Sequence, residues 1–417
     1  MKKTLIAILF VFTASSLQAE NWPAWRGADG SGISQEKNLP LSWSTTENIR
    51  WKVSLAEPCN GTPIIWGDRV FLTQGLDKGK RRAVIALDRA SGEKLWQQEL
   101  PCEVEETTHP QNPPCSSSPV TDGRAVYAQF GSAGVVAYDL DGKRLWHRDL
   151  GPVLHRWGNG PSPVLYGELL IVFHGPGTPA NLMALDKTSG KTVWTSKETA
   201  INSPIFGSWS TPLLLRGKRD ELIMPLPGDR IQGAGLFKSY DPATGKLLWK
   251  CDGLGNEVYA MPIPSPAGDL VVGISGHNGP AMAVRTGGSG DVTGTHQLWR
   301  TVEKNPQRVS SGVIDGEHLY IANANGTLDC LLAGSGELVW KGRLGGNLWG
   351  SMLLADGRIY LSNFDGVTFV VRSGEKFELL ATNHLAEPLY AAPAVSGGAI
   401  FLRTHKHLYC IGRGEGN

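Results

Sequence analysis

The chain lacks an excess of charge, an apolar run long enough to cross a membrane, and the common catalytic motifs. Its 40 basic and 39 acidic side chains leave a net charge of +1 over 417 residues, which gives no reason to expect nucleic acid or an anionic membrane as a partner. There is no Gly-x-Ser-x-Gly, no His-Glu-x-x-His and no phosphate-cradling glycine loop. The motifs of many hydrolases, zinc proteases and nucleotide-binding enzymes are therefore missing.

Glycine and proline are abundant, with 52 and 26 copies, but they recur at turn positions and form no low-complexity tract. This distribution argues against disorder. At the N-terminus, Lys2 and Lys3 precede a short apolar run at 5–12, and small residues lead to Ala19. The pattern predicts a secretory signal at residues 1–19, since the run is too short for a membrane span. We expect a monomeric chain, periplasmic or secreted, in a compartment that permits disulfides.

The string "ALDRASGEKLW" at 86–96 returns with few changes at 184–194 and 239–249. Its final tryptophan marks a repeat with intervals of 41 to 55 residues. An eighth unit at 373–380 keeps the turn but has Glu378 at the marker position. Repeats of this length are typical of propeller blades or helical arrays. The marker tryptophans are Trp51, Trp96, Trp146, Trp194, Trp249, Trp299 and Trp340.

Each repeat contains four short apolar runs separated by glycine turns, as in 117–123, 124–130, 134–140 and 143–150. Asp-Gly and Ser-Gly between such runs predict hairpins, and four antiparallel strands repeated along the chain predict a β-propeller. We therefore predict an all-β protein, a single eight-bladed propeller over residues 20–417. The last blade has only three strands of its own, so residues 48–55 are predicted to close the ring, which removes an unpaired edge.

The marker tryptophans are predicted to be structural. Each lies on the fourth strand of its blade, where its ring can lie against the turn of the next blade. An aromatic ring of this size buries roughly 200 Å², worth about 5 kcal/mol before entropy is counted.

The pattern Ala-x-Asp-x-x-x-Gly-x-x-x-Trp resembles the tryptophan-docking repeat of quinoprotein (PQQ-type) β-propellers. Residues 86–96 and 184–194 match it fully, 137–146 lacks one turn residue, and Ser239 replaces the alanine in 239–249. The segments "NWPAWRGADGSGIS" at 21–34 and "KHLYCIG" at 406–412 are similar to those of secreted PQQ-repeat propellers. The resemblance covers the mature chain.

The resemblance implies the fold and leaves two functional classes open, because one fold serves many activities. Quinoprotein dehydrogenases hold PQQ and calcium in the central funnel and oxidise alcohols or sugars. The propeller lipoprotein of the outer-membrane assembly machine is similar in fold, binds protein partners and carries no cofactor.

The dehydrogenase site has a ceiling made by a disulfide between neighbouring cysteines, and a calcium ion held by oxygen ligands. Here no two of the six cysteines are adjacent, and no acidic cluster supplies the six to eight oxygens that calcium needs. We therefore expect a non-catalytic scaffold without a cofactor. A PQQ- and calcium-dependent oxidoreductase is the alternative.

Loops of a propeller sort onto two faces. One face has short stereotyped turns, and the other has long irregular loops such as 101–114, 151–160 and 196–209. Because variable loops on a rigid scaffold commonly carry function, we predict that the irregular-loop face binds a protein, peptide or carbohydrate. The predicted ligand-binding residues are His109, His155, Arg156, Trp157, Asn159, Trp209, Tyr259, Arg308, Trp349 and Tyr390.

The histidines of this face do not have metal-ligand spacing in sequence, so a metal site is left open. Two disulfide pairings are also left open. Cys59 and Cys115 occupy equivalent positions in "PCNGTP" and "PCSSSP", and Cys102 competes for Cys115 through the loop between them.

Overall fold

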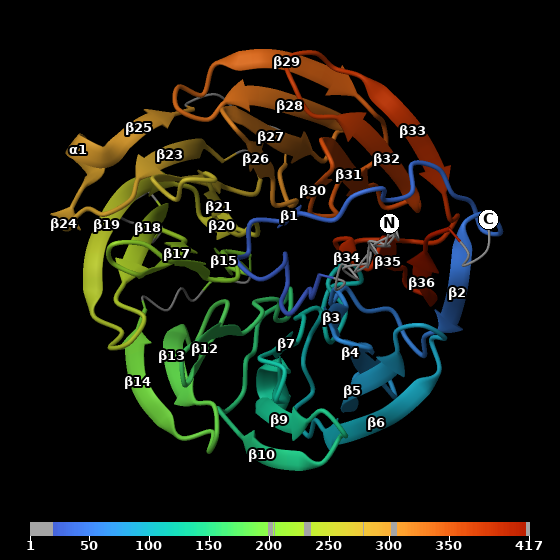
Figure 1. Cartoon of the computed structure of the whole chain (residues 1–417). Helices are drawn as coiled ribbons and strands as arrows, with labels where there is room; N and C mark the ends of the chain where they lie inside the picture. Colours follow the sequence, from blue (N-terminus) through green and yellow to red (C-terminus); the bar gives the residue numbers. More distant parts are fainter. Residues whose placement is uncertain are drawn as a thin grey trace, which may run out of the picture.

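The computed structural model describes residues 20–198, 203, 205–228, 235–277, 279–301 and 307–413. Within these residues, β-sheets stand around a single axis as a closed ring of eight blades (Figure 1). The prediction of an all-β, eight-bladed propeller is confirmed. The predicted signal at 1–19 lies outside the described residues. In the part that is described, no helix is long and apolar enough to cross a membrane.

Every blade contains four antiparallel strands, numbered from the axis to the rim (Figure 1). The first four blades are β3 (Ile64–Trp66), β4 (Arg69–Leu76), β5 (Arg81–Asp88) and β6 (Lys94–Pro101); β7 (Val120–Thr121), β8 (Ala125–Gln129), β9 (Val135–Asp139) and β10 (Arg144–Arg148); β11 (Val164–Tyr166), β12 (Leu169–His174), β13 (Asn181–Asp186) and β14 (Thr192–Lys197); and β16 (Leu213–Leu215), β17 (Glu221–Leu226), β18 (Gly235–Tyr240) and β19 (Leu247–Leu254).

The last four blades follow the same order. They are β21 (Ile263–Pro264), β22 (Leu270–Ile274), β23 (Ala281–Arg285) and β25 (Gln297–Arg300); β26 (Val313–Asp315), β27 (His318–Asn323), β28 (Thr327–Leu332) and β29 (Leu338–Arg343); β30 (Leu353–Ala355), β31 (Arg358–Ser362), β32 (Val367–Arg372) and β33 (Leu379–His384); and β34 (Ala394–Ser396), β35 (Ala399–Arg403), β36 (His407–Ile411) and β2 (Ile49–Ser54).

The eighth blade joins the two ends of the chain. Strand β2 pairs antiparallel with β36, with Trp51 opposite Cys410 and Lys52 opposite Tyr409. The predicted closure by an N-terminal strand is therefore confirmed, and it pairs the outer edge of β36, which would otherwise be open.

Short elements supplement the blades. Parallel bridges join β1 (Ile33–Ser34) to β30, β15 (Gly207–Ser208) to β20 (Glu257–Val258), and β24 (Gly290–Asp291) to β19. A 3₁₀ turn, η1 (Gly131–Ala133), and one short helix, α1 (Thr293–His296), complete the described elements.

Neighbouring blades are joined at the rim by the marker tryptophans. The Trp96 indole N–H donates to the Leu140 carbonyl of the next blade at 2.8 Å. A Cβ on Gly142, whose φ is +89°, would lie 2.8 Å from the Trp96 ring, so the turn needs glycine both for its backbone and for this close approach. Equivalent bonds run from Trp51 to Arg89, Trp146 to Lys187, Trp194 to Pro242, Trp299 to Ala333 and Trp340 to Gly374.

Trp249 departs from this pattern. It is fully buried, and its indole N–H donates to the Glu221 carboxylate within its own blade at 2.7 Å. The fifth blade has no short Ser-Gly turn at this level, because the connection containing β24 and α1 replaces it, and Gly290 pairs with the Trp249 backbone. The tryptophan therefore meets an insertion instead of a turn.

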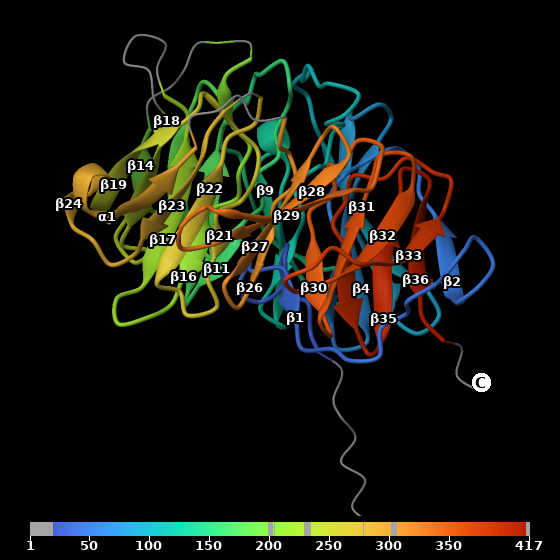
Figure 2. The same ribbon diagram turned by 90° about the horizontal axis from the view of Figure 1, so that it is seen from above.

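Seen from the side, the described N-terminal segment and β1 lie at one face of the ring (Figure 2). The short turns lie at this face, as the contacts of the N-terminal segment show: Asn21 accepts from the Gly67 backbone N–H, and Glu36 accepts from those of Gly397 and Gly398. The irregular loops lie at the opposite face. The two faces of the ring thus differ in what covers them.

Candidate functional site

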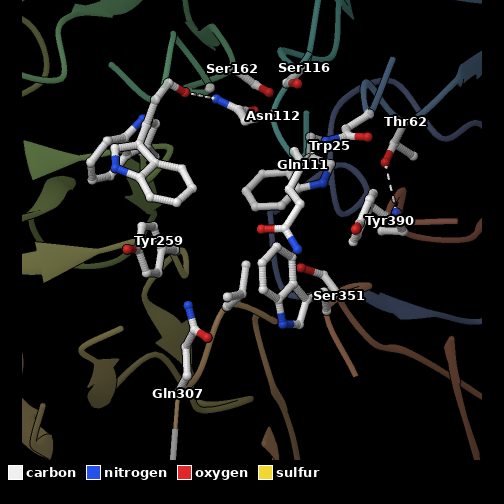
Figure 3. A pocket seen from close by; sticks show the side chains of 17 residues that line it. Trp25, Thr62, Gln111, Asn112, Ser116, Ser162, Tyr259, Gln307, Ser351 and Tyr390 are labelled. Atoms are coloured by element: carbon white, nitrogen blue, oxygen red, sulfur yellow. Dashed lines mark hydrogen bonds between the residues drawn. The ribbon is translucent and has the colours of Figure 1, made fainter. Parts of the chain in front are cut away.

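The axis of the propeller contains a pocket that opens among the irregular loops. Its empty space is about 960 Å³, a volume that includes the open solvent at its mouth. Side chains from most of the blades converge on it (Figure 3). The lining comprises Trp25, Asn60, Thr62, Gln111, Asn112, Ser116, Trp157, Gly160, Ser162, Trp209, Tyr259, Gln307, Val309, Trp349, Ser351, Tyr390 and Ala392.

The floor of the pocket comes from the N-terminal segment, which crosses the channel from the short-turn side. Trp22 bridges to Ile65 in the first blade, and Pro23 accepts from the Thr121 N–H in the second. Trp25 follows directly and lines the pocket. The channel is thereby closed on one side, and the pocket is blind.

Arg26 anchors this floor. The side chain is 1% exposed and donates to five carbonyl oxygens at 2.6 to 3.2 Å, two within its own turn and three at the axial starts of the sixth and seventh blades. The three distant acceptors belong to Ser311, Gly312 and Met352. Burial lowers the pKa of Arg26 to about 10, against a smaller raising effect of Asp29. One guanidinium therefore ties the segment to two blades.

A belt of hydroxyl groups encircles the axis where the innermost strands begin. The Thr62 backbone N–H donates to the Ser118 hydroxyl of the next blade at 2.8 Å, and Ser118 N–H donates to Ser162 at 2.9 Å. The same bond joins Ser162 to Thr211, Met261 to Ser311, Ser311 to Ser351 and Ala392 to Thr62. These backbone donors are thus satisfied across the blade boundaries.

Aromatic rings surround the upper part of the pocket. Trp209 and Tyr259 have ring centroids 5.2 Å apart, and Trp349 and Tyr390 form a second pair at 5.4 Å. Tyr259 and Tyr390 lie on opposite sides of the pocket (Figure 3). All except Trp209 are only partly buried, so their faces remain accessible to a ligand.

The structure brings together half of the predicted ligand-binding residues. Trp157, Trp209, Tyr259, Trp349 and Tyr390 line the pocket. They come from the approaches to the third, fourth, fifth, seventh and eighth blades, as expected for residues just before the innermost strands.

The predicted histidines support these aromatic rings from behind. His109 packs against Trp157 with ring centroids 4.0 Å apart and planes tilted by 33°, and His155 is buried edge-on against Trp209 at 5.0 Å. Burial lowers the pKa of both imidazoles, with the positive charge of Arg156 adding to the effect at His109. Burial therefore disfavours the protonated form of both imidazoles.

The other three predicted residues do not line this pocket. Arg156 is exposed outside it, and Asn159 donates to the Gly175 carbonyl and borders a smaller cavity. Arg308, placed by prediction at the funnel mouth, is 4% exposed and donates to Asn323 at 2.9 Å beside Asp329. A buried acidic partner holds this cation inside the sixth blade, and no sequence spacing indicated that partner.

The sequence reasoning missed the floor and the hydroxyl belt. Trp25 was noted only as part of a family-like opening, and Gln111 and Gln307 were not singled out. A signal for the belt existed, since a small hydroxyl residue precedes proline at the start of four blades, at Thr62, Ser118, Ser162 and Thr211.

All six cysteines are buried and free. Of the two pairings left open, the structure brings Cys59 and Cys115 into direct thiol contact. Burial alone would raise the pKa of Cys59, but the hydrogen bond with Cys115 and the charge of Arg403 outweigh it and lower the pKa to about 7. A Cys59–Cys115 disulfide stays a prediction.

The pocket does not fit PQQ with calcium. A flat tricarboxylated quinone needs cationic partners, and every described lining side chain is uncharged. Arg26 is engaged by carbonyl groups, and Arg308 lies beside Asp329. Among the described residues, no three His, Cys, Asp or Glu side chains gather where they could hold a metal ion.

Sheet order, repeat and axial pocket define a propeller of the PQQ-repeat class. The family model described as outer membrane protein assembly factor BamB matches residues 34–153, 132–289 and 233–377. Since these matches together extend over residues 34–377, the chain belongs to this family. The resemblance to PQQ-type propellers is confirmed.

A curated relative represents the dehydrogenase class. Quinoprotein alcohol dehydrogenase PedH of Pseudomonas putida is 31% identical over 140 residues, which are 32% of this chain and 22% of the dehydrogenase. The match thus spans only about a fifth of that enzyme.

Solved structures of both classes share the fold. BamB from Moraxella catarrhalis has a TM-score of 0.64 at 13% identity, with 88% of this chain and 98% of BamB covered. A europium-containing methanol dehydrogenase has a TM-score of 0.69 at 12% identity, with 94% of this chain and 89% of the dehydrogenase covered. The quinohemoprotein alcohol dehydrogenase from Comamonas testosteroni has a TM-score of 0.67 at 11% identity, with 94% of this chain and 81% of that enzyme covered. At these identities the likeness shows the fold alone.

Proposed function

We propose that this protein is an exported, non-catalytic scaffold that binds a protein, peptide or carbohydrate ligand through the axial pocket and its surrounding irregular loops. The observation that carries the proposal is the convergence of aromatic side chains from five blades on one blind cavity whose described lining is uncharged. Trp209 is buried and its indole N–H donates to the Gly158 carbonyl at 3.0 Å, but the other four rings take no part in the bonds cited above that join the blades at the rim and at the hydroxyl belt. Their accessible faces are therefore available for a partner, and tryptophan and tyrosine are enriched in binding hot spots.

A PQQ-dependent oxidoreductase is the second candidate, favoured by the match to PedH and by the dehydrogenase folds. The uncharged lining supports the scaffold over this alternative. The discriminating measurement is titration of the purified protein with PQQ and calcium, followed by absorption spectroscopy and calorimetry. We expect no saturable change; a stoichiometric spectrum together with dye-linked alcohol or sugar oxidation would overturn the scaffold proposal.

Binding through the pocket is tested with two triple variants. The first replaces Trp157, Tyr259 and Trp349 with alanine, and the matched control replaces the exposed turn residues Glu93, Lys143 and Lys246. For a ligand found on peptide or glycan arrays or by pull-down, the pocket variant should bind at least about tenfold more weakly, and the turn variant should be unchanged. The opposite result would place binding on the short-turn face.

Export is tested separately by expressing the full chain and sequencing the N-terminus of the periplasmic or secreted product. Cleavage after Ala19 is expected. Retention of residues 1–19 on cytoplasmic protein would remove the exported part of the proposal.

A further inference from the structure

The lining of the pocket restricts the charge of its ligand. Six aromatic residues, eight neutral polar residues and three small or aliphatic ones make up the described lining. The nearby Glu257 carboxylate accepts from the Tyr259 hydroxyl at 2.7 Å, so it is already paired. A charged group taken into this cavity would lose its hydration without gaining a counter-ion. The pocket therefore favours a neutral ligand.

The polar groups of the wall are complementary to hydroxyl groups. The hydroxyls of Thr62, Ser162 and Ser351 each accept a backbone N–H, and in the described chain none of them donates to a protein acceptor. Gln307 also lines the wall, and its amide group has no partner among the described residues. Because a hydroxyl oxygen and an amide both donate and accept, this wall matches a ligand that does both.

The aromatic rings supply flat apolar platforms next to these polar groups. Tyr259 and Tyr390 stand on opposite sides of the pocket, with Trp25 between them (Figure 3). A pyranose ring has the same division, with a C–H face that stacks on an aromatic ring and an edge of hydroxyl groups. The pocket places both kinds of partner within one cavity.

Two other occupants, an extended peptide and a quaternary ammonium cation, fit less well. An extended peptide would need free backbone donors to add a strand, but those of Thr62, Ser118 and Ser162 already donate to the hydroxyl belt. A quaternary ammonium ion would use the aromatic faces, yet it can accept no hydrogen bond from the wall hydroxyls and would leave them dry and unpaired.

We infer that the pocket binds a neutral saccharide, either a short free oligosaccharide or the end of a glycan chain, an inference that rests on the proposed scaffold function. The pocket takes an end and not the middle of a chain, because Trp25 and the Arg26 anchor close the channel below it. The sugar stacks between the aromatic platforms and exchanges hydrogen bonds with the belt hydroxyls and Gln307.

The experiment uses the full mature chain and defined probes. Calorimetry measures cellotetraose, maltotetraose, mannotetraose and chitotetraose, with tetragalacturonic acid as the acidic counterpart and choline as the cationic one. A glycan array with neutral and anionic chain ends separates immobilised ends from free oligosaccharides. We expect at least one neutral saccharide to bind, and the acidic and cationic probes to bind at least tenfold more weakly.

Three variants test the site. Trp157→Ala and Gln307→Ala should each weaken saccharide binding at least tenfold with an unchanged melting temperature. Leu154→Ala is the matched control, because Leu154 is 58% exposed on the same loop as Trp157 and lies outside the lining; its affinity should equal that of the wild type. Gln307→Ala keeps the test valid should Trp157→Ala fail to fold.

Each other outcome is decisive. Equal or tighter binding of the acidic or cationic probe, or no neutral glycan bound in either format, overturns the saccharide inference. If in that case a protein or peptide ligand is lost in the pocket triple variant, the scaffold function stands without it. If no ligand of any class responds to the pocket variants, both fail together.

Discussion

Two sets of tryptophans in this molecule have the same chemistry and different surroundings. At the rim, Trp96 lies against the glycine turn of the next blade, and its indole N–H is consumed by a turn carbonyl. At the axis, Trp25, Trp157 and Trp349 line a cavity and keep part of their surface accessible. The Trp349 N–H is buried and has no hydrogen-bond partner within the described residues. The two sets differ in whether the ring and its N–H are already bonded to the neighbouring blade.

We expect the rim tryptophans to contribute to stability and the axial tryptophans to contribute to ligand binding. A rim ring is held by one close-packed glycine and one hydrogen bond, so it contributes to the folded state. An axial ring is held from one side, by ring contacts such as that of His109 with Trp157, so its other side is available to a ligand. Substitutions at the two sets should therefore affect different measurements.

The largest effect is expected at the rim. Trp96→Ala and Trp194→Ala should each lower the free energy of unfolding by about 3–5 kcal/mol, the range for removing a large packed aromatic ring. Trp194 is buried, and Trp96 is partly buried but docks on the next blade through both its ring and its N–H. Denaturant unfolding measures this, and Leu95→Ala and Val193→Ala serve as controls, because these neighbours on the same strands are 48% and 54% exposed. Losses below about 1 kcal/mol at both tryptophans would erase the distinction.

The docking contact itself is tested from the opposite side. Gly142→Ala places a Cβ 2.8 Å from the Trp96 ring at a positive φ, so it should cost about 2 kcal/mol. In a Trp96→Ala background the clash disappears, and the cost should fall to about 1 kcal/mol. Gly167→Ala is the control, since its φ is +55° and no atom lies within 4 Å of its Cβ. Additive costs would contradict direct docking.

His405, beside the aromatic wall of the pocket, should make the stability of the fold depend on pH. Burial, together with the charge of Arg403, lowers the pKa of His405 from 6.5 to about 4, and this ring lies 5.4 Å from Tyr390. Between these values the unfolded chain binds the proton more readily, so stability is lost as pH falls from 6.5 to 4. Between pH 7 and 4.5 the loss attributable to His405 should be about 2 kcal/mol.

His405→Gln should flatten the pH dependence of unfolding by that amount, while His384→Gln, at an exposed position, should leave it unchanged. Identical pH profiles for the wild type and His405→Gln would show that this imidazole is not held neutral by the fold.

The smallest stability effect is expected for the axial set. Trp157→Ala should cost no more than about 1 kcal/mol, because this ring lines an open pocket and packs on His109 without docking into a glycine turn, and it should act on ligand binding instead. Thermal unfolding of Trp157→Ala beside Trp96→Ala makes the comparison direct. A loss at Trp157 as large as that at Trp96 would make the axial ring another structural contact.

Most of the fold could be predicted from local signals. Turn glycines and the tryptophan interval mark each blade, and the three-stranded C-terminal unit predicts that β2 closes the ring. The aromatic half of the site was also within reach, because Trp157, Trp209 and Tyr259 precede innermost strands and so lie near the axis.

Residues whose place depends on distant partners were not predictable in this way. Trp249 meets an insertion of the fifth blade, and Arg308 turns inward to Asp329. Trp25 becomes the pocket floor only because Arg26 binds carbonyl groups that are 285 to 326 residues away. No spacing within the N-terminal segment carries that information.

The sequence by itself thus determined the repeating blade, its number and its closure, because these depend on strand alternation, turn conformation and contacts between successive units. Only the tertiary structure decided that the channel is closed on one side, that hydroxyl groups line its wall, and that none of the described lining side chains carries a charge. Those properties arise where side chains from most of the blades meet at one axis, and such convergence is set by the closed ring and not by any local pattern.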